Sequence, residues 1–341
     1  MRFSLHKIVI IALFVGGLFC SLQAQQEVQF TQYMFNRLTY NPAYAGSHGA
    51  ICASLMYRSQ WMGLQLDNPT KDISAGSVPT DYLFSVDLPI KVLHGGVGLT
   101  VLGEKLGYHN NIGINLDYAF RIYWGRGTLA AAIEANVFNS NFEYSQLVGS
   151  DDLTGDFSNP VTGSSSDPLL SSREDASSML FDLSTGIYYQ VPGTYYLGLS
   201  IKNLLGSKSE VLNYTNVRTI YLMGGYDYVL PFHPSFKLKP SLLAKTTQFT
   251  SWQLDLSCLL EYQNEFWLGA AYRIDDAVSI LGGVNWEKLR VGLAYDLTTS
   301  KLGTFKSGRS KGTLELYLRY CFKIIIPHEE PSVYRNTRYL L

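Results

Sequence analysis

The side chains that could carry out chemistry in this sequence are scattered rather than grouped. Neither the H-E-x-x-H of zinc proteases, the G-x-S-x-G of serine hydrolases nor a P-loop occurs. Beyond the first 24 residues the histidines stand far apart, at His48, His94, His109, His233 and His328. A serine, a histidine and an orienting acid can converge from distant strands, so an enzyme remains the weakest of the alternatives. We expect no enzymatic activity and no cofactor.

The cysteines give no clear pattern either. Cys52, Cys258 and Cys321 are an odd number at wide spacing, which indicates neither a disulfide framework nor a metal site. Each lies in a strand-like run, so we expect three small apolar residues on a wall. The net charge is −1 with no basic block, which makes nucleic acid an unsuitable partner.

The beginning of the chain indicates its compartment. Arg2 and Lys7 precede an apolar run over 8–19, and the stretch 21–24 offers a small residue for cleavage before Gln25. Residues 1–24 therefore read as a secretory signal peptide. Cys20 raises a lipoprotein alternative, but the bulky Phe19 before it favours simple cleavage.

The remaining chain has the alternation of membrane-crossing strands. After the signal peptide no apolar run reaches the roughly 18–20 residues of a membrane helix. Between Ile112 and Ile122 the even positions are apolar, whereas the odd ones include Asn115, Asp117 and Arg121. A period of two sustained over about 9–11 residues is typical of a tilted strand in an outer-membrane β-barrel.

Such segments repeat from residue 50 to 324, which predicts an all-β fold, a transmembrane antiparallel β-barrel of about fourteen strands. The predicted strands are 50–61, 81–90, 95–103, 111–123, 128–143, 179–191, 194–205, 218–230, 235–247, 251–262, 265–274, 277–286, 289–299 and 313–324. Short connections rich in turn-forming residues alternate with longer ones, as they do when all short turns face the periplasm. The predicted short turns are 88–94, 124–127, 192–193, 231–234, 263–264 and 287–288, and the predicted long connections are 62–80, 104–110, 144–178, 206–217 and 300–312.

Two features of the predicted strand 235–247 add expectations. Pro240, inside a predicted strand, implies a bulge or a local break. Its neighbours Lys237, Lys239 and Lys245 would face Asp255 and Glu261 across the lumen wall, either as ion pairs or as a solvated surface.

The two remaining segments are polar. Residues 144–178 contain Asp151, Asp152, Asp156 and Asp167, but not at EF-hand spacing, so an extracellular loop is favoured over a calcium site. Residues 325–341 form a predicted periplasmic tail.

The stretch at 25–49 is different from everything that follows. It is aromatic and rich in amides, with Arg37 as its only formal charge between residues 29 and 47, and turn-forming Asn41-Pro42 and Gly46 interrupt it. Such a segment needs cover, and we expect it to plug the periplasmic mouth of the barrel. Phe30, Tyr33, Phe35, Tyr40 and Tyr44 would pack on the lumen wall, while Gln32, Asn36 and Asn41 satisfy buried backbone groups. Arg58 and Gln60, on the same side of the first strand as Met56, would hydrogen-bond to this plug.

The same stretch resembles the opening of the PorP/SprF family of outer-membrane proteins of the type IX secretion and gliding-motility system of Bacteroidetes. The residues that carry the resemblance are Gln29–Asn36, Tyr40–Ser47 and Tyr57–Trp61, within which the motif positions are Gln32, Tyr33, Phe35, Asn36, Asn41, Pro42, Ala43, Gly46, Arg58, Gln60 and Trp61. The later strands match only as a generic barrel.

The resemblance implies a non-enzymatic role in protein export or gliding. Family members work in the outer membrane with periplasmic ring, peptidoglycan-associated and translocon components, and some pair with a large secreted adhesin through its C-terminal domain. Both chain termini would be periplasmic. The alternative is a FadL-like transporter of small hydrophobic molecules, which also has fourteen strands and an N-terminal plug. The charged lumen faces favour the first function, although Leu259 and Trp267 on the lumen side weaken that argument.

Overall fold

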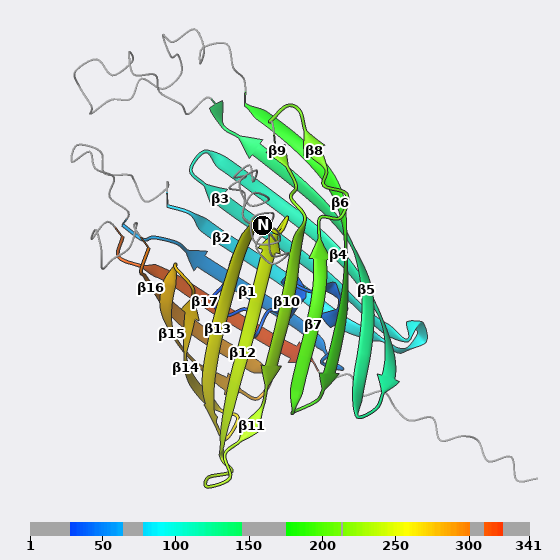
Figure 1. The fold of residues 1–341 in the computed structure, drawn as a ribbon, viewed down its shortest axis with the longest axis vertical. Coiled ribbons are helices and arrows are strands. Elements are labelled where there is room, and N and C mark those ends of the chain that lie inside the picture. Colours follow the sequence, from blue (N-terminus) through cyan, green and yellow to red (C-terminus); the bar gives the residue numbers. More distant parts are fainter. Residues whose placement is uncertain (1–27, 64–77, 145–174, 213, 301–309, 323–341) are drawn as a thin grey trace, which may run out of the picture.

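The chain forms a closed antiparallel β-barrel (Figure 1). The computed structural model describes residues 28–63, 78–144, 175–212, 214–300 and 310–322. Each wall strand pairs with its neighbour in sequence, and β1 also pairs with β17, which closes the ring. The wall strands are β1 (Ile51–Ser59), β2 (Thr80–Ile90), β3 (Gly95–Leu106), β4 (His109–Trp124), β5 (Gly127–Phe142), β6 (Ala176–Val191), β7 (Tyr195–Lys202), β10 (Thr219–Tyr226), β11 (Tyr228–Val229), β12 (Phe236–Thr247), β13 (Ser251–Tyr262), β14 (Phe266–Arg273), β15 (Ala277–Trp286), β16 (Leu289–Thr298) and β17 (Thr313–Phe322).

β10 and β11 are two pieces of one wall strand, so the barrel has fourteen strands, as predicted. The register against β12 is the same on both sides of the interruption, with Gly225 opposite Ser241 and Tyr228 opposite Leu238. The interruption therefore faces Pro240, which cannot donate a ladder hydrogen bond. The predicted local break is present, and it lies in the facing strand rather than as a bulge in β12.

The predicted faces of the strands are confirmed. On β13, Leu256 and Leu260 are exposed on the outer wall, whereas Asp255, Ser257 and Glu261 are buried toward the lumen. Outward apolar and inward polar residues are the arrangement that a barrel in lipid requires. Among the described residues no helix is both long enough and apolar enough to cross a membrane.

The connections sort to two ends of the barrel. We call the end where β1 begins and β17 ends the turn end, because each of its connections from β2–β3 to β15–β16 is short; the opposite end is the loop end. The connection predicted at 104–110 is wrong: β3 and β4 continue until only Gly107 and Tyr108 join them, and Gly107 takes the left-handed φ of +60° that this turn needs. At the loop end, residues 206–217 carry a small hairpin of β8 (Lys208–Ser209) and β9 (Tyr214–Thr215), and a short 3-10 helix, η5 (Lys91–Leu93), precedes β3 at the turn end.

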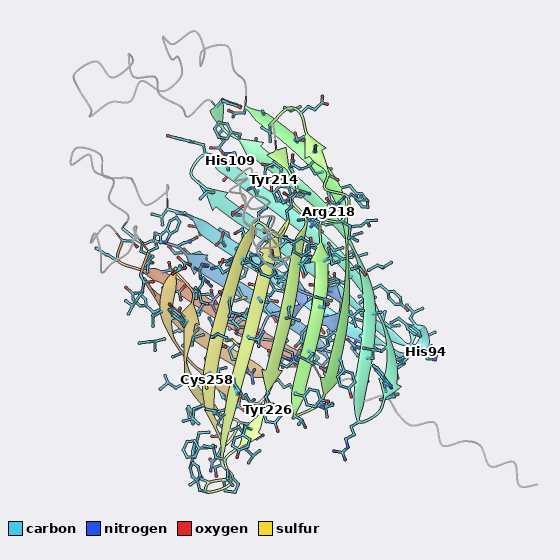
Figure 2. All side chains as sticks on the ribbon, in the orientation of Figure 1. His94, His109, Tyr214, Arg218, Tyr226 and Cys258 are labelled. Atoms are coloured by element: carbon cyan, nitrogen blue, oxygen red, sulfur yellow. A yellow bond between two sulfur atoms is a disulfide. The ribbon has the colours of Figure 1, made fainter. Side chains whose placement is uncertain are left out.

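The expectation for the cysteines is wrong for two of them. Cys52 on β1 and Cys321 on β17 lie directly opposite each other and form a disulfide across 269 residues of sequence. Spacing along the chain could not reveal this pair, because ring closure is what brings the first and last strands together. Cys258 is free and exposed on the outer wall, in the lower part of the view in Figure 2.

The predicted charge pairs on the lumen wall form in part. Lys239 lies 2.8 Å from Glu261, while Lys237 donates to the side chain of Asn264 instead. The main partner of Asp255 is Arg273, at 3.1 Å. The signal peptide 1–24, most of the loop 144–178 and the tail 325–341 lie outside the described residues.

Candidate functional site

Residues 28–50 lie inside the barrel, and we call them the lumen segment. They form a chain of tight turns with two 3-10 helices, η2 (Arg37–Thr39) and η3 (Pro42–Tyr44). Asn41 begins η3 by accepting a hydrogen bond from the N–H of Ala43 at 3.0 Å, and Pro42 supplies a φ suited to the first helical position. Most side chains between Phe30 and Ala45 are deeply buried, from Phe30 at 0% exposure to Phe35 at 7%.

The first residues of the segment are held by a buried charged network at the loop end, which we call the carboxylate anchor. The guanidinium of Arg58 on β1 lies 3.1 Å from both Asp296 on β16 and Glu315 on β17. Glu315 accepts the backbone N–H groups of Thr31 and Gln32 at 2.7 and 2.8 Å, and the Thr31 hydroxyl donates to Asp296. Charge-assisted hydrogen bonds of this kind are about twice as strong as neutral ones.

Aromatic packing fixes the middle of the segment. The ring of Phe35 stacks on Tyr317 with centroids 5.5 Å apart and tilts against Trp267 at 4.8 Å. The Tyr317 hydroxyl donates to the Phe35 carbonyl at 3.2 Å, and the guanidinium of Arg290 lies 4.8 Å from the Phe35 ring. Gly292 on the wall leaves space for the neighbouring Gln32 of the segment, because a Cβ at this position would lie 2.3 Å from Gln32 Oε1.

A second group of aromatic residues surrounds Arg37. Its guanidinium lies 3.6 Å from the centre of the Tyr196 ring and donates to the Tyr188 hydroxyl at 2.9 Å. Burial alone would lower the pKa of Arg37, but Tyr188, Tyr196 and Tyr44 outweigh this and raise it, so the side chain stays charged. Burial also raises the pKa of the Tyr40 hydroxyl, which accepts the Phe30 N–H.

The segment ends at the turn end of the barrel. The Gly46 N–H donates to Asp87 on β2 at 2.9 Å, and the side chain of Gln190 donates to the Ser47 carbonyl at 3.0 Å. Gly46 has a φ of +70°, and a Cβ at this position would lie 2.8 Å from the Leu88 carbonyl oxygen. Both the backbone conformation and the lack of space therefore require glycine here. Because its start contacts Glu315 at the loop end, the segment extends along the lumen, well beyond the mouth where we expected it.

The amide side chains behave differently from one another. Asn41 donates to the Ile187 carbonyl at 3.0 Å and so satisfies a backbone group, as predicted. Asn36 instead donates to the Thr39 hydroxyl and to the sulfur of Met56. Gln32 is fully buried, and within the described part of the chain neither of its side-chain polar atoms has a hydrogen-bond partner, so the prediction is wrong for Asn36 and Gln32.

The other predicted residues are placed as follows. Tyr33 donates its hydroxyl to the Asp255 carbonyl at 3.3 Å and lies 3.1 Å from the Ser257 hydroxyl. Gln60 and Trp61 follow the end of β1, where their backbone N–H groups bond to Pro79 and Thr313. Among the described residues neither side chain hydrogen-bonds to the lumen segment, so the role expected for Gln60 is wrong.

Sequence reasoning missed the wall residues that hold the segment, above all Asp296, Glu315 and Tyr317. The signal that could have found them is their position, since all three fall on the inward face of an alternating strand. The described histidines are spread over both ends of the barrel: His94 lies at the turn end and His109 at the loop end (Figure 2).

A small cavity of about 110 Å³ remains beside Tyr40 in the loop-end half of the lumen. Its walls combine polar and apolar side chains, and the polar ones include Glu104, Asn115, Asn136 and Lys202, the last of which pairs with Glu134. Phe138 and Tyr214, stacked with centroids 5.4 Å apart, also line it.

The sequence was compared with known proteins. The family model described as type IX secretion system membrane protein PorP/SprF matches residues 22–320. The chain belongs to the PorP/SprF family. The chain is thus a member of a secretion-system family and not of an enzyme family, and its barrel is an outer-membrane barrel.

Three solved barrel structures are similar to this PorP/SprF protein. Omp33 of Acinetobacter baumannii is 6% identical with a TM-score of 0.43, covering 80% of this chain and 98% of its own. A Pseudomonas aeruginosa FadL homologue is 11% identical with a TM-score of 0.42, covering 82% and 92%. The P. putida toluene transporter TodX is 11% identical with a TM-score of 0.42, covering 85% and 94%. A search among curated proteins found no significant match.

Proposed function

We propose that this protein is a non-enzymatic outer-membrane component of the type IX secretion system whose barrel is closed by its own lumen segment. The observation that carries the proposal is the burial of this segment between the carboxylate anchor at one end and Asp87 at the other. A barrel filled in this way leaves little space for solutes to pass through. Its loops, its turn end and the parts of its lumen that the segment leaves open are the surfaces that it offers to other proteins.

The partners proposed from family membership are of two kinds. One is the secretion machinery: periplasmic ring, peptidoglycan-associated protein and translocon. The other is a large secreted adhesin, bound through its C-terminal domain. Because β1 begins and β17 ends at the turn end, we place the short turns and the C-terminal end of β17 in the periplasm, and the long connections outside the cell. The lumen segment itself starts at the loop end, so this placement does not extend to the N-terminus.

The competing function is that of a FadL-like transporter of small hydrophobic molecules. Such a protein needs an apolar pocket in the lumen. The lumen cavity beside Tyr40 has amides, a carboxylate and a buried ion pair among its apolar side chains, so its lining is mixed. The apolar hollow of the described barrel, bordered by Leu55, Tyr82 and Phe84, involves side chains exposed on the outer wall, where lipid covers them.

Affinity purification tests the two functions against each other. The tagged protein would be isolated in mild detergent from its own cells, beside an unrelated outer-membrane barrel with the same tag. We expect enrichment of secretion-machinery proteins or of a secreted C-terminal domain over the control barrel. Recovery of none of these, together with uptake of a fluorescent fatty acid by proteoliposomes, would replace the secretion role with transport.

A separate measurement tests whether the lumen segment closes the barrel. In planar bilayers the wild-type barrel should conduct at most weakly, because the segment fills the lumen. A steady open channel of porin size in the wild-type protein would contradict closure, whichever partners are found.

A further inference from the structure

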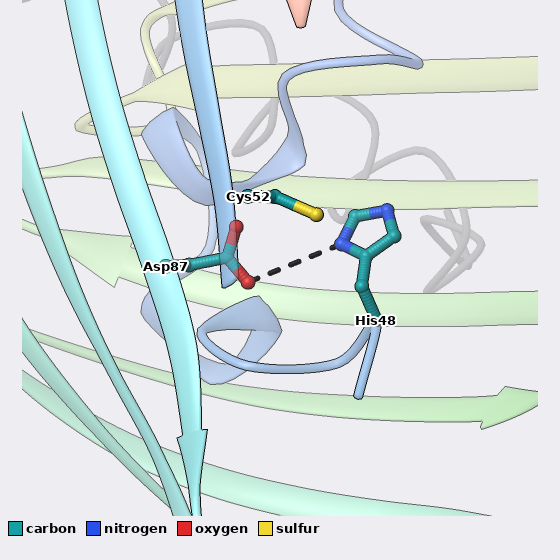
Figure 3. A group of neighbouring side chains, drawn as sticks. All are labelled: His48, Cys52 and Asp87. Atoms are coloured by element: carbon teal, nitrogen blue, oxygen red, sulfur yellow. Dashed lines mark ion pairs between the residues drawn. The ribbon is translucent and has the colours of Figure 1, made fainter. Parts of the chain in front are cut away.

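Three side chains of metal-binding types meet at the turn end, where the lumen segment becomes β1, and a fourth is bonded to one of them. His48 comes from the segment, Cys52 from β1 and Asp87 from β2, and their donor atoms lie within 4.8 Å of one another (Figure 3). The fourth, Cys321 on β17, is joined to Cys52 in the disulfide. None of these groups takes part in the carboxylate anchor or the aromatic packing of the segment's middle.

We propose that the thiol form of Cys52 and Cys321 is a binding site for a divalent metal ion of the zinc class, completed by His48 and Asp87. Two thiolates, an imidazole and a carboxylate are a donor set that Zn²⁺ accepts in tetrahedral sites. In the disulfide form the two sulfurs are bonded to each other, so only the histidine and the aspartate remain. Metal binding and disulfide formation are therefore alternative states of the same seam between β1 and β17.

The groups around the donors support this role. The Tyr44 hydroxyl lies 2.9 Å from His48 Nε2, which leaves Nδ1 facing Asp87 Oδ2 at 3.9 Å. The Gly46 N–H holds that same carboxylate at 2.9 Å. Outer hydrogen bonds of this kind orient the ligands of metal sites and fix the histidine tautomer. His48 keeps 24% of its side chain exposed, so an ion can enter from water.

The chemistry balances in both directions. When the metal binds, the two thiols lose their protons to solvent and each sulfur forms a bond to the ion. When an external disulfide oxidises the pair, the two thiolates give up two electrons to form the Cys52–Cys321 bond, the reagent is reduced to two thiolates that take up protons from solvent, and the metal leaves. Two thiolates and one carboxylate outweigh the charge of a divalent ion by one, and the nearby Arg319 and Arg37 offset that excess.

Cobalt spectroscopy on the purified barrel tests the site. Cys258→Ser removes the unrelated thiol, and the protein would be refolded in detergent with a phosphine reductant and titrated with Co²⁺. We expect the absorption bands of thiolate-bound tetrahedral cobalt at one ion per chain, their loss on adding Zn²⁺, and no bands in the oxidised protein.

Variants separate this site from simple thiol binding. His48→Ala and Asp87→Asn should each weaken Co²⁺ binding at least 10-fold, and Tyr44→Phe about 10-fold, whereas His94→Ala, at the same end but outside the cluster, should bind as the parent does. Absence of thiolate bands in the reduced parent, or equal affinity in His48→Ala, would overturn the proposal. If Asp87→Asn does not fold, His48→Ala and Tyr44→Phe decide the question. The measurement uses the isolated barrel, so it stands independently of any secretion partner.

Discussion

Replacing Arg58 with methionine should release the start of the lumen segment. Arg58 lies 3.1 Å from both Asp296 and Glu315, and its side chain is 3% exposed. Removing one partner of a buried ion pair costs about 3–5 kcal/mol, because the remaining charges are left without compensation. Glu315 keeps its hydrogen bonds from the backbone of Thr31 and Gln32, so we expect a value near the lower limit, about 3 kcal/mol.

Hydrogen exchange measures this loss where it occurs. If the cost appears as local opening, about 3 kcal/mol corresponds to a roughly 150-fold fall in the protection of the Thr31 and Gln32 amides. The matched control is Lys239→Met, which removes the cation of another lumen pair, Lys239–Glu261, that does not contact the segment. Exchange at Thr31 and Gln32 that is unchanged in Arg58→Met, or raised equally by Lys239→Met, would refute the anchor.

Three further changes test other parts of the structure. In the Cys52→Ser/Cys321→Ser double variant the loss of a bond that closes 269 residues should cost about 4–5 kcal/mol, seen as a lower temperature of gel-shift unfolding than for the oxidised parent; an unchanged midpoint would argue that ring closure does not need the bond. Gly46→Ala should destabilise the barrel more than Gly49→Ala, because both have a positive φ but only Gly46 also has backbone within 3 Å of the new Cβ; urea midpoints that are equal would show that the contact is absent. Leu256→Arg, on the outer wall, should reduce insertion into lipid vesicles by about 2–4 kcal/mol relative to Leu256→Ala, and full insertion would mean that the faces are reversed.

The barrel could be predicted from the sequence because its physics is local. A strand with lipid on one side and a polar lumen on the other must alternate, and β13 and β16 do so almost without exception. Even the break opposite Pro240 follows from one residue that lacks an N–H. The connection predicted at 104–110 is wrong, because polar residues such as Glu104 can lie on a lumen wall as well as in a loop.

The contacts of the lumen segment could not be predicted in the same way. Thr31 meets Glu315 and Cys52 meets Cys321 only after the ring has closed, and nothing near either residue indicates its partner. Gln32 is a further example. A buried amide is expected to have hydrogen-bond partners, yet the wall residues beside it are Gly292 and the ring of Trp267. The family resemblance at Gln29–Asn36 identified the important stretch without showing what holds it.

The path of the lumen segment also constrains how the barrel assembles. Its first residues contact strands that are nearly the last to leave the ribosome, with 284 residues between Thr31 and Glu315. Contacts this distant in sequence form late and slowly, because a long chain must first be brought together. The finished ring surrounds the segment, so its contacts with β16 and β17 can form only once these strands are in place. The lumen segment and the last strands of the barrel thus depend on each other for their final positions.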